Sequence, residues 1–159
     1  PPLAPLDLAA LARSVVAELA PEAVARDQAL EWEDHRSGAA AGSRCLVPGD
    51  ETLLRVLLRN LLENAIRYAG PDARIVISLA GDAVHFVLAV ADSGPGLPDD
   101  QRARLGERFH RPDVTAASGS GLGWSICLRI CAVHGFALDS GRAPGLGGLR
   151  VTVNGPCAV

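Results

Sequence analysis

A chain of 159 residues that is 48% hydrophobic can bury one sizeable core, so we expect a single domain over residues 1–159 rather than two. The net charge of −3 is scattered and leaves no basic stripe of the kind that follows a nucleic acid backbone, which argues against nucleic acid as a partner. No apolar run approaches the ~20 residues that span a bilayer, so we expect no direct membrane contact.

The four cysteines fit neither a metal site nor a disulfide framework. Cys127 and Cys131 are four residues apart inside a helical pattern, which favours reduced thiols. Because the chain starts at Pro1 and contains no methionine, we expect it to be a piece of a longer protein.

The first predicted elements are one helix and two strands. Apolar residues recur at helical spacing from Asp7 to Arg26, with Asp7 as the N-cap and Pro21 expected to kink or split the helix. The segments Ala29–Glu33 and Arg44–Pro48 are strand-like and are separated by small residues, which predicts a hairpin at the edge of a sheet.

The strongest helical pattern begins after Asp50 and runs to Tyr68, where Gly70 and Pro71 stop it. Its leucines at 54, 58, 61 and 62 define the face expected to pack on the core. Two apolar strands follow around a turn at Gly81 and Asp82, and the second strand ends at Asp92.

The remaining chain contains a polar helical turn, a helix and two strands, predicted at 99–105, 122–134, 136–141 and 147–155. The order is therefore α, ββ, α, ββ, α, ββ. This order favours an α/β (α+β) two-layer sandwich, with a mixed, mainly antiparallel sheet covered on one face by about three helices, over a doubly wound parallel sheet.

Four polar side chains of the central helix share one stripe. Asn60, Asn64, Arg67 and Tyr68 follow the spacing i, i+4, i+7 and i+8 beside the leucine face. Asn60 and Asn64 are either half-buried amides with ordinary partners or oxygen ligands for Mg²⁺, with an arginine for phosphate and a tyrosine for base stacking nearby. The stripe alone leaves both interpretations open.

Asp92 ends a strand and is followed by Gly94 and Gly96. A carboxylate here can accept a hydrogen bond from an amine such as the adenine 6-amino group, while glycines let the backbone approach a ligand. An ordinary turn explains the same residues and, when they are taken alone, is the favoured interpretation.

A third glycine group, Gly119, Gly121 and Gly123, precedes the helix predicted at 122–134, whose free N–H groups would suit a polyphosphate. No G-x-x-x-x-G-K-[ST] motif occurs, and the spacing G-x-G-x-G differs from the dinucleotide fingerprint. Both familiar phosphate motifs are therefore excluded, and with them a dinucleotide-dependent oxidoreductase is disfavoured.

Taken in order, RNLLENAIRYA, DSGPGLP, ERFHRP and GSGLGWSIC resemble the N, G1, F and G2 boxes of the catalytic ATP-binding domain of bacterial sensor histidine kinases, in the GHKL superfamily with its Bergerat fold. The resemblance extends from about Leu6 to Val153 and is strongest to the QseC-type subgroup. It implies that residues 1–28 include a linker helix toward a dimerisation domain.

The resemblance also implies a role for each site residue. Asn60 and Asn64 would hold Mg²⁺ and the phosphates, Arg67 would contact phosphate, and Tyr68 would stack near adenine. Asp92 would bind the adenine amine in a pocket shaped by two glycines. The rest of the ATP site would be formed by residues of the lid and its ends: Gly94, Gly96, Arg108, Phe109, Arg111, Gly119, Gly121, Leu122 and Gly123.

Two residues depart from the family pattern: Trp124 is bulkier than usual after GLG, and Arg67 replaces the commoner lysine. Related ATPases use a glutamate where this chain has Asn60, and an amide cannot act as a general base, which favours transfer over hydrolysis. Glu63 is a candidate for polarising the acceptor histidine.

The resemblance implies a protein-histidine kinase domain whose acceptor histidine lies on a separate dimerisation domain, with a response regulator downstream. None of the four histidines has the H-E-x-x-[ST]-P context of an acceptor. Two other functions remain open, an ATP-binding regulatory module without transfer activity and a GHKL-type ATPase. We expect a cytoplasmic domain of an inner-membrane sensor.

Overall fold

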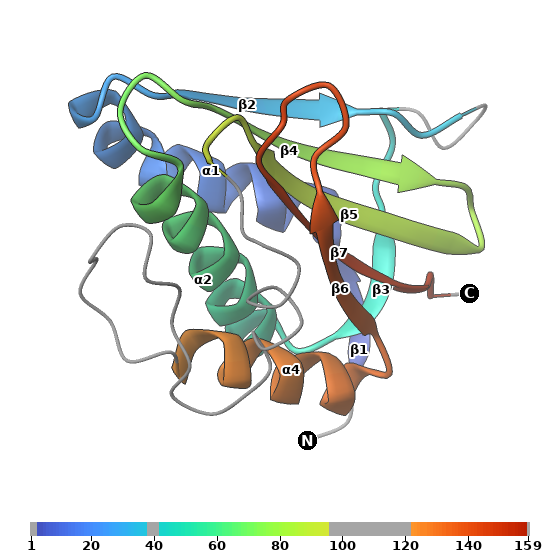
Figure 1. Ribbon diagram of the computed structural model, residues 1–159. Helices are drawn as coiled ribbons and strands as arrows, with labels where there is room; N and C mark the ends of the chain where they lie inside the picture. Colours follow the sequence, from blue (N-terminus) through green and yellow to red (C-terminus); the bar gives the residue numbers. More distant parts are fainter. Residues whose placement is uncertain (1–2, 38–41, 96–121, 159) are drawn as a thin grey trace.

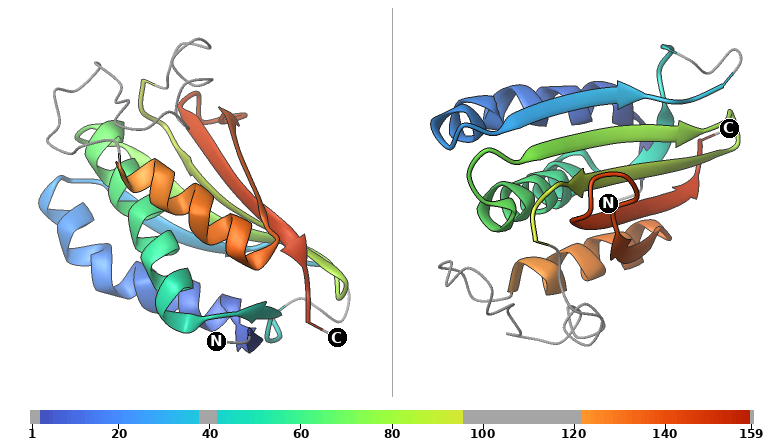
Figure 2. Two further views of the ribbon diagram at one scale, coloured as in Figure 1. Left: turned by 90° about the horizontal axis from the view of Figure 1, so that it is seen from below. Right: turned by 45° about the horizontal axis from the view of Figure 1, so that its top comes forward.

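The computed structural model describes residues 3–37, 42–95 and 122–158, and its helices lie together on one face of a sheet (Figures 1 and 2). The elements in chain order are β1 (Ala4–Asp7), α1 (Leu8–Ala25), β2 (Ala29–Asp34), β3 (Leu46–Gly49), α2 (Glu51–Ala69), β4 (Arg74–Gly81), β5 (His85–Asp92), α4 (Leu122–His134), β6 (Ala137–Arg142) and β7 (Leu149–Pro156). The predicted two-layer sandwich is confirmed.

The main sheet has five strands in the order β2-β4-β5-β7-β6. Only β2 runs parallel to its neighbour, β4, and the other three pairings are antiparallel, so the sheet is mixed and mainly antiparallel as expected. The parallel pair needs a crossover, and the chain between β2 and β4 contains β3 and α2.

The predicted edge hairpin of β2 and β3 is wrong. β2 pairs with β4 in the register Leu30 to Ile75, while β3 pairs antiparallel with β1, a strand that the sequence analysis missed. The parallel register places Leu30 and Trp32 where they pack against the core, which a separate hairpin would not provide.

Of the two outcomes predicted at Pro21, a kink or a split, the split is wrong, because helix α1 is continuous through this residue. Pro21 and Ala17, the residue whose carbonyl loses its helical donor, both lie on the exposed face, where water can replace the missing bond. Asp7 is the N-cap and accepts from the Ala10 N–H at 3.3 Å. The linker role of residues 1–28 stays a prediction, and α1 itself packs its buried side chains into the core.

Helix α2 is the central element of the helical layer, lying between α1 and α4 (Figure 2). Asp50 caps it by accepting from the Leu53 N–H at 3.0 Å, and Gly70 ends it with a φ of 86°. The leucines predicted to face the core are all buried. None of the helices in the described parts of the chain is long and apolar enough to cross a membrane.

The later elements agree with the predictions wherever they are described. The turn between β4 and β5 is closed by Asp82, whose carboxylate accepts from the N–H groups of Val84 and His85 at 2.8 and 3.0 Å. The four cysteines are free thiols, as expected. The helical turn predicted at 99–105 lies outside the described residues.

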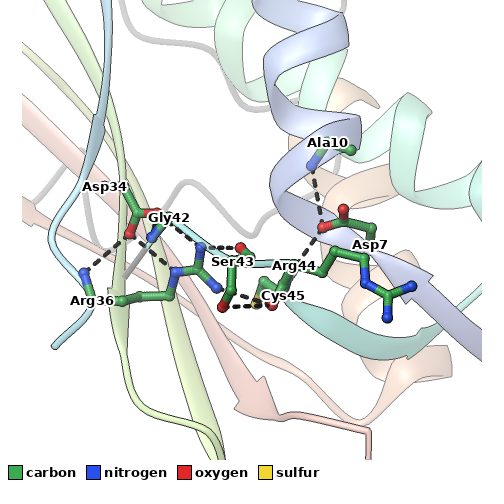
Figure 3. A network of polar contacts seen from close by, with 8 residues as sticks. All are labelled: Asp7, Ala10, Asp34, Arg36, Gly42, Ser43, Arg44 and Cys45. Atoms are coloured by element: carbon green, nitrogen blue, oxygen red, sulfur yellow. Dashed lines mark hydrogen bonds and ion pairs between the residues drawn. The ribbon is translucent and has the colours of Figure 1, made fainter. Parts of the chain in front are cut away.

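A buried polar network fixes the segment that joins the two sheets (Figure 3). Arg36 forms an ion pair with Asp34 at 2.8 Å and donates to the Arg44 carbonyl at 3.2 Å. Asp7, at the start of α1, accepts from the Cys45 N–H at 3.0 Å. Because the Arg36 side chain is 2% exposed, the ion pair and hydrogen bonds offset the cost of burying its positive charge.

Candidate functional site

The two asparagines of the stripe on α2 face the first turn of α4. A Cβ built on Gly123 would lie 3.2 Å from Oδ1 of Asn60 and 4.0 Å from Nδ2 of Asn64. A side chain at this position would crowd the Asn60 amide, whereas its distance to Asn64 would be an ordinary contact, so glycine suits the close approach of α4 to Asn60. Asn60, Asn64 and Gly123, predicted to belong to one site, are brought together by the structure.

The orientation of the Asn60 amide is set by its own helix. Its Nδ2 donates to the Val56 carbonyl at 3.0 Å, so the NH₂ group is bonded within α2. The amide oxygen Oδ1 therefore points toward α4. An oxygen acceptor thus lies beside the start of a helix, where the first N–H groups have no partner within the helix itself. This combination can bind a hard cation together with an anion such as a phosphate.

The other candidates on α2 lie at its exposed edge and C-terminal end. Arg67 and Tyr68 are half-buried in the last turn, beyond Asn64. Glu63 lies 3.6 Å from the guanidinium of Arg59, which also bonds Glu18 of α1 at 2.7 Å. The Glu63 carboxylate is therefore part of a surface ion-pair chain between α1 and α2.

Asp92, at the end of β5, is 5% exposed and held from two sides. Its Oδ1 accepts from the N–H of Gly94 at 2.9 Å and from the N–H of Leu149 at 3.4 Å. Burial raises the pKa of Asp92, and the two backbone N–H groups oppose that rise. Both of these bonds use Oδ1, and no residue in the described parts of the chain bonds Oδ2, the oxygen that could accept from a ligand.

Two glycines make the environment of Asp92 possible. A Cβ on Gly94 would lie 2.6 Å from Cα of Ala69, at the end of α2, and one on Gly148 would lie 2.2 Å from Oδ1 of Asp92. Gly148 and Leu149 were not predicted from the sequence as site residues. The Gly-Gly pair at 147 and 148, just before the last strand, was the signal that could have indicated a close backbone contact.

Several predicted site residues lie outside the described residues, namely Gly96, Arg108, Phe109, Arg111, Gly119 and Gly121. Leu122 begins α4. Trp124, the unusual residue after GLG, lies in the first turn of α4, is half-buried and packs against the core. The described part of the chain contains no group of three or more His, Cys, Asp or Glu that could hold a metal.

Comparison with known proteins identifies close similarity to a nucleotide-binding family. Residues 49–157 match the model of the histidine kinase-, DNA gyrase B-, and HSP90-like ATPase family. The chain is 44% identical over 95 residues to sensor protein QseC of Escherichia coli K12, which covers 60% of this chain and 20% of QseC. It is 33% identical over 150 residues to sensor protein kinase PmrB of Pseudomonas aeruginosa, covering 94% of this chain and 30% of PmrB.

A solved structure extends the similarity to the fold. The mycobacterial sensor histidine kinase MprB superposes with a TM-score of 0.83 at 26% identity, over 97% of this chain and 98% of that chain. The chain thus matches one solved kinase domain from end to end, but it spans less than a third of the length of QseC and PmrB.

Proposed function

Because this chain belongs to the histidine kinase-, DNA gyrase B- and HSP90-like ATPase family, we propose that it binds ATP with Mg²⁺ and presents the γ-phosphate to a histidine on a separate dimerisation domain. One observation carries the proposal. The asparagines of α2 lie close to Gly123 at the start of α4, and the buried carboxylate of Asp92 lies near the C-terminal end of α2.

Asp92 is suited to bind the adenine base. Its Oδ1 is held by backbone N–H groups, so Oδ2 would accept a hydrogen bond from the exocyclic amine in a site from which water is largely excluded. Gly94 packs on Ala69, and this contact sets the distance between the carboxylate and the end of α2. Tyr68, in the same turn, would stack near the base.

The phosphate end of the site would be formed by Asn60, Asn64, Arg67 and the first turn of α4. The donor set fits Mg²⁺, since Asn60 presents an amide oxygen whose orientation the Val56 carbonyl fixes. When bound, Mg²⁺ would supply charge neutralisation on the phosphate oxygens. The chain itself would contribute the helix N-terminus and the Arg67 guanidinium, both of which attract anions.

The residues of α2 support transfer to a protein acceptor rather than hydrolysis. The amide of Asn60 cannot take a proton from water at neutral pH, and Glu63 is engaged with Arg59. Phosphoryl transfer depends chiefly on positioning and charge neutralisation, which this site offers. Glu63 is solvent-accessible and would face an incoming acceptor histidine.

Two partners would lie outside this chain. The acceptor histidine would come from the dimerisation domain of the same protein, and a response regulator would receive the phosphoryl group. The similarity to sensor proteins supports a cytoplasmic position for this domain in an inner-membrane sensor.

Adding the separately expressed dimerisation domain and γ-labelled ATP to this chain tests the proposal. We expect an acid-labile, base-stable phosphohistidine on the added domain, and we expect Asn64→Ala to abolish it. Phosphate release without a labelled histidine would indicate an ATPase, and ATP binding without either product would indicate a regulatory module.

A further inference from the structure

His134, the last residue of α4, connects the C-terminal end of that helix to the start of α2. Its Nε2 lies 3.1 Å from the backbone nitrogen of Asp50, and its Nδ1 lies 2.7 Å from the Ile130 carbonyl. The side chain is 5% exposed and packs on Phe136 with ring centroids 5.3 Å apart. The packed histidine that the apolar helix predicts is therefore present, with both ring nitrogens engaged.

The two partners determine how the ring is protonated. A carbonyl can only accept, so Nδ1 donates to Ile130, and a backbone N–H can only donate, so Nε2 accepts from Asp50. One neutral tautomer satisfies both bonds.

This contact completes the cap of α2. In a capping box, the side chain at the third helical position bonds the N–H of the N-cap residue, but here that position is Leu53, which has no polar atom. The Asp50 carboxylate accepts from the Leu53 N–H, while His134 from a different helix accepts from the Asp50 N–H. The missing half of the capping box is supplied by α4.

Helix α4 consequently lies against α2 at both ends. Gly123 in its first turn lies close to Asn60 and Asn64, and its last residue is bonded to the N-cap. The buried Cys127, Ile130 and Cys131 between these ends pack the helix against the core through the non-directional hydrophobic effect. The hydrogen bond between Asp50 and His134 adds a directional constraint on the position of α4 along α2.

We propose that His134 is a positioning residue for the phosphate end of the nucleotide site, because it sets where the first turn of α4 stands relative to Asn60 and Asn64. The inference rests on the proposed function. Loss of the bond to Asp50 would let α4 shift along α2 and misplace the N–H groups that face the phosphates. Asp92, on β5, would keep its own contacts.

A matched pair of variants separates the two bonds of the ring. In His134→Asn, the amide nitrogen takes the place of Nδ1 and can still reach Ile130, but nothing reaches Asp50. In His134→Gln, the longer side chain places an amide oxygen near the position of Nε2 and can accept from Asp50. Thermal unfolding of both variants establishes that they are folded.

The measurement is the ratio of the Kd for adenosine to the Kd for ATP with Mg²⁺, obtained by NMR titration of each variant. Adenosine uses only the Asp92 end of the site, so a general loss of stability would leave this ratio unchanged. We expect His134→Asn to lower the ratio about fivefold, the factor that corresponds to one net hydrogen bond, and His134→Gln to stay close to the wild type.

A wild-type ratio in His134→Asn would overturn the inference, as would an equal loss in both variants. A wild-type chain that binds adenosine as tightly as ATP would instead contradict the proposed phosphate site itself. The two failures are therefore distinguishable.

Discussion

Replacing Asp92 by asparagine tests the proposed adenine contact with almost no change in shape. Asparagine retains an oxygen that can accept from the N–H groups of Gly94 and Leu149, which bond Oδ1 in the wild type. These two donors orient the new amide so that its NH₂ group takes the place of Oδ2. The substitution therefore puts a donor where the proposed site needs an acceptor.

The expected loss follows from the burial of this group. Asp92 is 5% exposed, so a mismatched donor opposite the adenine amine would find little water to compensate it. An unsatisfied buried hydrogen-bonding group costs about 1 to 3 kcal/mol, and this corresponds to roughly a 5- to 150-fold increase in the Kd for ATP. ADP should be affected equally, because the phosphates are not involved.

Inosine triphosphate sharpens the assay, since it carries a keto oxygen in place of the 6-amino group. Isothermal titration should show that Asp92→Asn loses affinity for ATP and gains affinity for inosine triphosphate relative to the wild type. Asp139→Asn, which changes an exposed carboxylate on β6, is the matched control. An unchanged ATP affinity in Asp92→Asn would refute the adenine contact.

The Asp92→Asn variant should also differ from the wild type in how its stability depends on pH. Because burial raises the pKa of Asp92 above its unfolded value, the carboxyl favours folding at low pH, and this contribution is lost as the pH rises through the folded pKa. The ionised group is therefore unfavourable at neutral pH. Asp92→Asn should be at least as stable as the wild type at pH 7, with any advantage disappearing in acid.

Three further predictions concern the frame of the site. Gly94→Ala would place a Cβ 2.6 Å from the backbone of α2, so it should lower the affinity for ATP and the stability of the fold. We expect a loss of stability of about 1 to 3 kcal/mol in thermal unfolding. The control Gly141→Ala, which has open space around its Cβ, should lower neither quantity. Asn64→Ala should remove the Mg²⁺ dependence of ATP binding measured with and without EDTA, and a dependence that persisted would exclude this ligand. Arg36→Leu should destabilise the fold by about 3 to 5 kcal/mol at pH 7 in urea unfolding. Arg36 holds the pKa of Asp34 well below its usual range, so the difference in the free energy of unfolding between the wild type and this variant should narrow as the pH falls. A difference that stays constant with pH would count against a stabilising ion pair.

Elements specified by local patterns could be predicted from the sequence. The apolar face, N-cap and terminal glycine of α2 lie within one continuous segment, and so do the strands and turn of the β4–β5 hairpin. The pairing of β2 with β4 and of β3 with β1 is not local. The alternation of apolar and polar residues shows which face of a strand is buried, but it does not show which other strand is its neighbour. The hairpin of β2 and β3 was wrong because it assumed that strands adjacent in the sequence pair with each other.

In the candidate site, too, some features follow from local sequence and others only from the packing of distant segments. Spacing alone placed Asn60 and Asn64 on one stripe, but only the packing of α4 against α2 brings Gly123 to them. The contact of Gly148 with Asp92 joins residues 56 positions apart, and its only local trace is a pair of glycines. The connection from His134 to Asp50 has no local signal at all, because it spans 84 positions.

Titration of the wild-type chain with a non-hydrolysable ATP analogue, with and without Mg²⁺, followed by NMR at the backbone amides, tests the central claim most directly. We predict tighter binding with Mg²⁺ and shifts at both ends of the site, at Gly94 and Leu149 beside Asp92 and at Gly123 beside the asparagines. The account would be contradicted by a Kd that is the same with and without Mg²⁺ together with unchanged chemical shifts at these amides, and also by the absence of binding.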